Sequence, residues 1–102
     1  MAPGFGRCVT IKGGAPADAP WVAGHFPGRP IVPGAILLGY AARILDEAGF
    51  DVLAVRRMKF LQPLPPGRTF TIKVRPRGGD AEVFWTADDI LVARAHLELA
   101  GR

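Results

Sequence analysis

The sequence predicts an α+β fold in which a curved antiparallel sheet wraps around one long central helix. One segment, residues 35–48, is long and apolar enough for a helix, whereas the segments after it alternate between apolar and polar residues like strands. The apolar residues of the helical segment lie nearly all round its axis. We therefore expect other elements to bury this helix on most sides. A length of 102 residues predicts a single domain over residues 1–102.

The elements are expected in the order strand, long loop, helix and four further strands. Residues 5–12 are rich in residues that favour extended backbone, and they predict the first strand. Residues 13–34 are dense in Gly and Pro and predict a loop. The helix is expected to begin near Pro33, because proline suits a first helical turn, and to end at Gly49.

The four later strands are expected at residues 52–61, 68–75, 81–87 and 90–99. In the last strand the inward residues are expected to be Leu91, Ala93, Ala95, Leu97 and Leu99, and the outward ones Arg94, His96 and Glu98. A helix that is apolar all round must be covered by other elements, and a curved sheet formed by the alternating strands can cover it by holding the helix in its hollow. This arrangement is the hotdog fold.

The net charge of +4, from 13 basic and 9 acidic residues, favours acidic partners. No basic run is interleaved with stacking aromatic residues, so we expect no nucleic-acid partner. The one basic cluster, Arg56-Arg57-Met58-Lys59, is expected to be the solvated face of a strand.

The single cysteine, Cys8, allows no internal disulfide, which fits a cytoplasmic location. We expect no signal peptide and no membrane span, because the longest apolar stretch is interrupted by Gly39 and Arg43. We also expect no metal and no other cofactor. The two histidines and the cysteine lack ligand spacing, and no glycine-rich nucleotide motif follows a strand.

The loop before the helix has the residues for acid–base chemistry. His25 precedes Pro27, Pro30 and Pro33, which stiffen the chain up to the helix start. A histidine can exchange a proton near neutral pH, and free N–H groups at a helix N-terminus can polarise a carbonyl oxygen. Together they suit proton abstraction beside a thioester carbonyl. Alternatively, His25 is a packed loop histidine, and the residues alone leave both interpretations open.

Residues 24–38, Gly-His-Phe-Pro-Gly-Arg-Pro-Ile-Val-Pro-Gly-Ala-Ile-Leu-Leu, resemble the His-Phe-Pro-Gly-x-Pro-x-x-Pro-Gly segment of the 3-hydroxyacyl-acyl-carrier-protein dehydratases of bacterial fatty acid synthesis. Residues 58–67 are similar to a second stretch of that family, so the resemblance covers nearly the whole chain. It implies a lyase that acts on 3-hydroxyacyl thioesters of acyl carrier protein or coenzyme A in fatty acid, other lipid or polyketide biosynthesis. It also implies a homodimer or a higher homo-oligomer.

The resemblance also implies roles for single residues. His25 matches the catalytic histidine, and Gly34 matches the residue whose backbone N–H binds the thioester carbonyl, with Phe26 and Pro33 beside them in the substrate-binding loop. The family's second catalytic group is a Glu or Asp on the helix, and its position here is Gly39. Glycine has no side chain and cannot act as a general acid. Three explanations stay open: Gly39 allows close packing, it is simply tolerated, or it makes room for a bulkier substrate.

Other groups are poor substitutes for the missing acid. Tyr40 is adjacent, but neighbouring helix residues point about 100° apart. Asp46 is seven residues further on, about 10 Å along the axis. Asp18 lies in a segment that the sequence pattern does not place, and a partner chain is a further source. We expect His96 to be an exposed strand histidine, since it alternates with polar residues.

Three functions follow from these residues. The first is a dehydratase that is slow because general acid catalysis, typically worth about 10²–10⁴-fold, is missing. The second is a non-catalytic hotdog partner or acyl-carrier-binding module, to which the Arg56-Arg57 cluster and the positive charge are suited. The third is a hotdog thioesterase, which needs a carboxylate to direct water.

Overall fold

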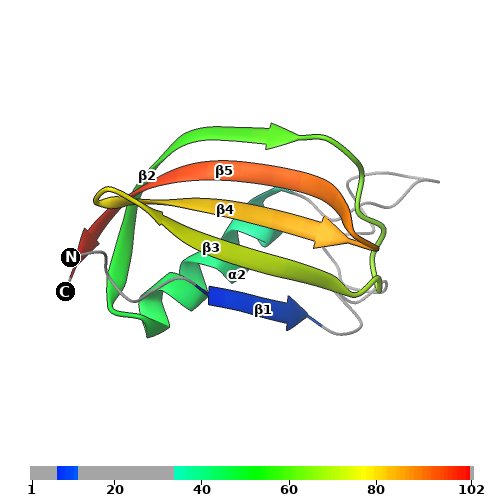
Figure 1. The fold of residues 1–102 in the computed structure, drawn as a ribbon, viewed down its shortest axis with the longest axis horizontal. Coiled ribbons are helices and arrows are strands. Elements are labelled where there is room, and N and C mark those ends of the chain that lie inside the picture. Colours follow the sequence, from blue (N-terminus) through cyan, green and yellow to red (C-terminus); the bar gives the residue numbers. More distant parts are fainter. Residues whose placement is uncertain (1–6, 12–33, 102) are drawn as a thin grey trace.

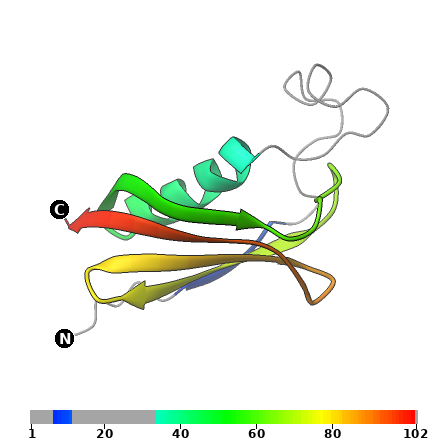
Figure 2. The same ribbon diagram turned by 90° about the horizontal axis from the view of Figure 1, so that it is seen from above.

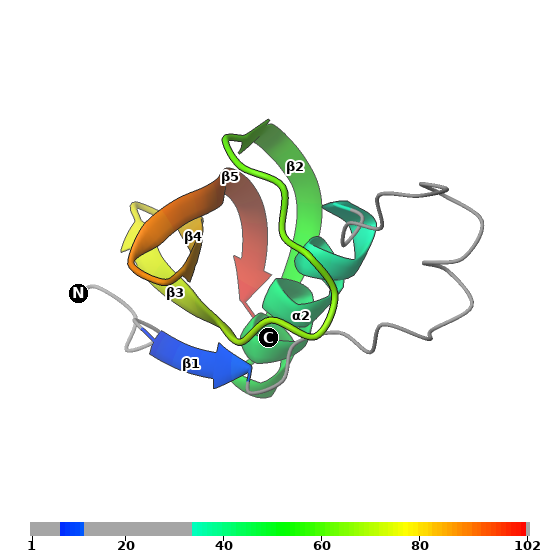
Figure 3. The same ribbon diagram turned by 90° about the vertical axis from the view of Figure 1, so that its right-hand side faces the viewer.

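The computed structural model describes residues 7–11 and 34–101. The elements in these ranges are β1 (Arg7–Ile11), α2 (Gly34–Glu47), β2 (Phe50–Phe60), β3 (Phe70–Arg77), β4 (Asp80–Ala87) and β5 (Ile90–Gly101). The strands form one antiparallel sheet in the order β1-β3-β4-β5-β2. The sheet curves around α2, which lies along its inner face (Figures 1 and 3). The predicted hotdog fold is confirmed.

The turns between the last three strands follow from local backbone chemistry. Gly78, with φ +60°, begins the two-residue connection between β3 and β4. Asp88 and Asp89 both have positive φ, 51° and 61°, in the two-residue connection between β4 and β5. Aspartate tolerates this left-handed region better than most residues, and two such residues in succession favour a tight hairpin. Both turns lie where the sequence predicts them.

The core lies between the inner face of the sheet and one face of α2. Figure 2 shows the helix on one side of the sheet only. On β3 the buried residues are Phe70, Ile72 and Val74, as the alternation predicts. The alternation of β5 breaks once, because Val92 is buried while Leu91 is only half-buried. The pairing of β4 with β5 shifts between Trp85 and Thr86, and this irregularity turns the Val92 side chain into the core.

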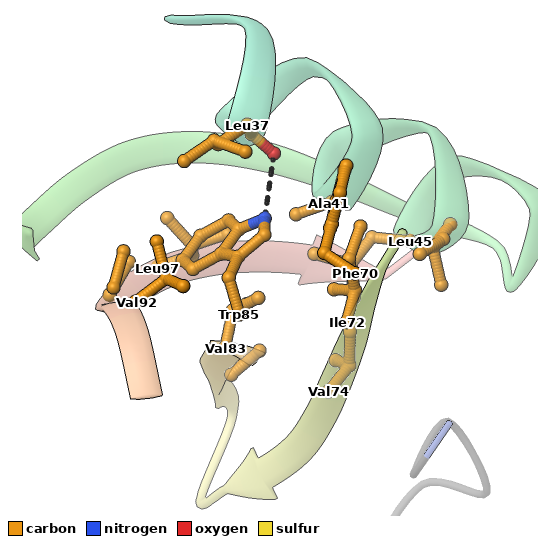
Figure 4. Packing of buried hydrophobic residues seen from close by; sticks show 14 of the residues in the cluster. Leu37, Ala41, Leu45, Phe70, Ile72, Val74, Val83, Trp85, Val92 and Leu97 are labelled. Atoms are coloured by element: carbon orange, nitrogen blue, oxygen red, sulfur yellow. Dashed lines mark hydrogen bonds between the residues drawn. The ribbon is translucent and has the colours of Figure 1, made fainter. Parts of the chain in front are cut away.

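Trp85 joins the sheet to the helix at the centre of this core. Its side chain is fully buried, and its Nε1–H donates a hydrogen bond of 3.1 Å to the backbone carbonyl oxygen of Leu37 (Figure 4). The indole therefore buries a large apolar surface while its one polar group has a partner. This contact holds the first half of α2 at a fixed height above β4.

The helix is less enclosed than its composition predicts. Its buried residues, Leu37, Ala41, Ile44 and Leu45, form one stripe that faces the sheet. Ala35, Gly39 and Arg43 lie on the opposite, exposed side. Among the described residues the sheet covers only one side of the helix (Figure 3), so residues 7–11 and 34–101 do not bury α2 on most sides as expected.

Candidate functional site

Gly34 is the first residue of α2 and lies against the last residue of β2. A β-carbon built on Gly34 would collide with the tip of the Phe60 ring, and the ring's Cε1 would lie 3.0 Å from it. Gly34 is half-buried, whereas Phe60 remains 55% exposed. Gly34 and Phe60, one from each of the two stretches that resemble the dehydratases, are therefore in contact at the helix start. Phe60 belongs to the second stretch, but only the structure shows that it covers Gly34.

The helix start is a suitable place for a developing negative charge. The first N–H groups of a helix have no partner within the helix, and the helix dipole places partial positive charge there. The first turn of α2 holds no acidic side chain that would offset this charge. The apolar ring of Phe60 lowers the water access of the backbone at Gly34, which strengthens a hydrogen bond made there. Gly34 can therefore present its N–H to a carbonyl oxygen.

Gly39 lies on the exposed side of α2. No atom of the described residues lies within 4 Å of a β-carbon built at this position. As far as residues 7–11 and 34–101 are concerned, the space of the expected acid is therefore open. Close packing of another described element does not explain the glycine, and a longer side chain fits at this position without a collision.

The two groups nearest to Gly39 in sequence that could replace the acid point elsewhere. Tyr40 is half-buried and packs edge-on against Phe70, with ring centroids 5.7 Å apart and planes at 72°. Its side chain is thus directed toward the sheet and away from the side of the helix that holds Gly39. Asp46 is exposed near the last turn of α2, far from the helix start. The expectation that neither residue occupies the acid position agrees with their places in the structure.

Four of the residues considered from the sequence lie outside the described ranges. They are His25, Phe26, Pro33 and Asp18. Their predicted roles remain predictions, and the described part of the candidate site consists of Gly34, Gly39 and the neighbouring Phe60.

The second histidine, His96, is not a free surface residue. Its Nε2 lies 2.8 Å from Oδ2 of Asp80, and about a quarter of its side chain (27%) is exposed. The backbone N–H of Leu99 donates a longer hydrogen bond of 3.4 Å to the other oxygen of Asp80. The hydrogen bond from His96 lowers the pKa of the Asp80 carboxyl below its ordinary value. The expectation of an exposed histidine is wrong, because it ignored a partner that follows the hairpin turn on the neighbouring strand.

Apolar side chains gather along β2, which is an edge strand of the sheet. Leu53, Val55, Phe60 and Leu61 are between 42% and 59% exposed, on or just after this strand. A long edge strand with exposed apolar residues is usually covered by another chain, since it otherwise invites uncontrolled strand pairing. Phe60, the last residue of β2, contacts the helix start at Gly34. A chain that covers this strand would therefore lie beside the candidate site.

The described residues contain no group of three or more His, Cys, Asp or Glu side chains that could hold a metal ion. In the same ranges no helix has both the length and the apolar character to cross a membrane.

Comparisons of sequence agree with this geometry. Residues 5–95 match the family model described as ApeI-like, ApeI dehydratase. The chain is 33% identical over 92 residues to a 3-hydroxyacyl-[acyl-carrier-protein] dehydratase FabZ of Chlamydia trachomatis serovar L2, an alignment that covers 74% of this chain. That alignment covers 60% of the relative, so the chain matches well under two thirds of its length. The present chain is also 30% identical to the 3-hydroxyacyl-[acyl-carrier-protein] dehydratase FabZ of Herpetosiphon aurantiacus, in an alignment that covers 92% of this chain and 77% of the relative.

Solved structures share the fold. The dehydratase heterocomplex ApeI:P from Xenorhabdus doucetiae superposes with a TM-score of 0.79 at 20% identity, over 93% of this chain and 86% of the other. An uncharacterised protein of Erwinia carotovora gives a TM-score of 0.70 at 23% identity, over 92% and 82%. At these identities the likeness concerns the arrangement of sheet and helix.

Proposed function

Because this chain belongs to the ApeI-like dehydratase family, we propose that it binds 3-hydroxyacyl thioesters and eliminates water from them slowly. The observation that carries the proposal is the half-buried helix start at Gly34, which lies beside the apolar ring of Phe60 and has no acidic side chain in its first turn. The thioester is carried by an acyl carrier protein or by coenzyme A, in fatty acid biosynthesis or a related lipid or polyketide pathway.

In the proposed reaction the N–H of Gly34 binds the thioester carbonyl oxygen, and His25 removes a proton from the carbon beside it. The negative charge that develops on the oxygen is stabilised by the helix start. The C–O bond at the next carbon then breaks, a C=C double bond forms, and His25 returns its proton to the departing hydroxyl, which leaves as water. His25 does both steps because Gly39 has no proton to give. The loss of a separate acid slows the reaction by about 10²–10⁴-fold.

A matched pair of substitutions tests this reaction. Gly39→Glu supplies a carboxyl group at an open position, whereas Gly39→Gln has nearly the same shape and no acid. We expect formation of the unsaturated thioester to be slow in the unchanged protein, much faster with Glu and unchanged with Gln. His25→Ala should abolish it. The proposal fails if no variant forms product, or if His25→Ala leaves the rate intact.

We further propose that two copies associate through their β2 edges. The support is the place of β2 at the edge of the described sheet, together with the exposed side chains of Leu53, Val55 and Phe60. The expected result is a dimer in analytical ultracentrifugation, and a monomer after Val55→Lys, which places a charge on the apolar edge. The matched control is Ile90→Lys, since Ile90 is also an exposed apolar residue (55%, against 45% for Val55) but lies at the β4–β5 turn. A monomer at every concentration of the unchanged protein would contradict the proposal.

The second candidate is a non-catalytic partner of an active relative. Two observations favour it: the absent acid at Gly39 and the apolar β2 edge. The structural neighbour ApeI:P of Xenorhabdus doucetiae is a dehydratase heterocomplex, and this supports pairing of the present chain with a different chain. If this role is correct, the isolated Gly39→Glu variant dehydrates the thioester no faster than the unchanged protein. The chain then binds a dehydratase of the same family through β2.

A further inference from the structure

The outer face of the sheet, the side turned away from α2, is strongly basic. Figure 1 looks onto this face. The segments 56–59, 73–82 and 94–98 contain seven basic and three acidic residues, which gives a net charge of +4. The formal charge of the whole chain is also +4, so this part of the outer face accounts for the entire excess. Arg56-Arg57-Met58-Lys59, predicted as one solvated strand face, is thus part of a surface that spans several strands.

Strand pairing brings two of these arginines to either side of the His96–Asp80 pair. Arg57 of β2 is the register partner of His96 on β5, and Arg77 of β3 is the register partner of Asp80 on β4. Because neighbouring strands lie about 4.8 Å apart, each arginine lies one strand from its partner. His96 and Asp80 are themselves joined by their 2.8 Å hydrogen bond. The four side chains therefore form an arc across β2, β5, β4 and β3.

This arc lines a hollow of about 470 Å³, together with Arg56. The volume lies within the range of about 300–1,000 Å³ that is usual for small-molecule sites. A smaller adjoining hollow of about 100 Å³ shares Arg57, Arg77 and His96 and adds Arg94. Several guanidinium groups thus converge on one concave surface.

The acidic residues of this face are already engaged by other groups. Arg56 pairs with Glu98 at 2.6 Å, and Arg75 pairs with Glu82 at 3.2 Å. Asp80 is held by His96 and the backbone of Leu99.

Five cations of this face have no carboxylate partner in the part of the chain that the structure describes: Arg57, Lys59, Lys73, Arg77 and Arg94. Of these, Arg57, Arg77 and Arg94 line the two hollows. Like charges held this close repel one another, so a bound anion would lower the energy of the site.

We propose that this hollow is a second ligand site, which binds the diphosphate group of a phosphorylated ligand. Arg57 and Arg77 hold the group from its two sides, since guanidinium forks bind phosphate oxygens in pairs. His96 also lines the hollow, and its pairing with Asp80 keeps the ring in place. Figure 2 shows α2 on one side of the sheet. His96 alternates along β5 with the buried Ala95 and Leu97, so the hollow that it lines lies on the other side and is separate from the proposed thioester site.

Binding of inorganic pyrophosphate tests the proposal, with affinity measured by isothermal titration calorimetry and thermal stability measured beside it. Pyrophosphate should raise the melting temperature more than sodium chloride of equal ionic strength, because specific binding stabilises the folded state. Arg57→Ala and Arg77→Ala should each weaken binding about tenfold or more, as expected for the loss of a charged hydrogen bond. The matched control is Arg68→Ala. Arg68 is also exposed, but it pairs with Asp88 beyond the other end of β4.

Three results overturn the proposal: no binding of pyrophosphate, an equal loss of affinity in Arg68→Ala, or full affinity in both hollow variants. Coenzyme A, whose diphosphate is esterified, distinguishes the two sources of the diphosphate group, an organic ligand and inorganic pyrophosphate. If the Arg57 and Arg77 variants weaken coenzyme A and pyrophosphate alike, the ligand is an organic diphosphate. If they weaken pyrophosphate alone, it is inorganic. No acyl transfer or dehydration is measured, so the outcome does not depend on the proposed function.

Discussion

Replacing Gly39 with alanine is expected to stabilise the folded protein by about 1 kcal/mol. Glycine in a helix interior costs about 0.8–1.0 kcal/mol relative to alanine, and Gly39 is the sixth residue of the fourteen-residue α2. The new methyl group meets no atom of the described residues within 4 Å, so neither collision nor extra burial alters this value. In a domain of about 100 residues, 1 kcal/mol corresponds to a rise of about 4–8 °C in melting temperature.

Urea denaturation and thermal melting measure this effect, and Gly49→Ala is the matched control. Gly49 likewise has no neighbour within 4 Å of a built β-carbon, but its φ is +92°. Alanine there should destabilise the fold by about 1–2 kcal/mol, because its side chain disfavours the left-handed region. A loss of stability in Gly39→Ala would refute the reasoning. It would show that a partner or another segment packs closely on Gly39, which is the packing explanation left open by the sequence.

Three further substitutions test single contacts. Gly34→Ala should cost about 0.5–1.5 kcal/mol, because the exposed ring of Phe60 must turn away from its preferred rotamer. Phe60→Ala should relieve most of that cost, and additive losses in a double-mutant cycle would argue against the contact. Trp85→Phe should cost about 1–3 kcal/mol in urea denaturation through a lost hydrogen bond and a small cavity, and an unchanged midpoint would contradict the role of the indole. Asp80 has a pKa below 3.8 in the folded state, so its stabilising effect is present above about pH 4 and is lost as the pH falls through the lowered value. Asp80→Asn should therefore lose less stability than the unchanged protein between neutral pH and about pH 3, and equal losses would rule out the His96 pairing as the cause.

Local patterns were sufficient to predict most of the fold. Alternation on β3 placed Phe70, Ile72 and Val74 in the core because each faces the same side of a regular strand. The burial of Val92 was missed, since it depends on a shift in pairing with β4 that leaves no mark in the composition of β5. The exposure of one side of α2 was also missed. Apolar residues show that a surface will be covered, but they do not show whether the same chain covers it.

The place of Gly34 in the fold could be predicted from residues close to it in sequence, whereas contacts between distant segments could not. The position of Gly34 at the helix start followed from the preceding proline and the apolar run. The contact with Phe60 was missed, because it joins residues 26 positions apart. The pairing of His96 with Asp80 was missed for the same reason. It requires the register of β4 and β5 as well as the place of the hairpin turn.

The most direct test of the central claim is the rate at which a 3-hydroxyacyl thioester loses water with the unchanged protein and with Gly39→Glu. If this family member retains the helix start at Gly34 and the histidine at position 25 but lacks only the helix acid, the unchanged protein forms the unsaturated thioester slowly. Gly39→Glu should then raise the rate by about 10²–10⁴-fold, the usual contribution of a general acid. No product with either protein, under conditions where both remain folded, would contradict the claim.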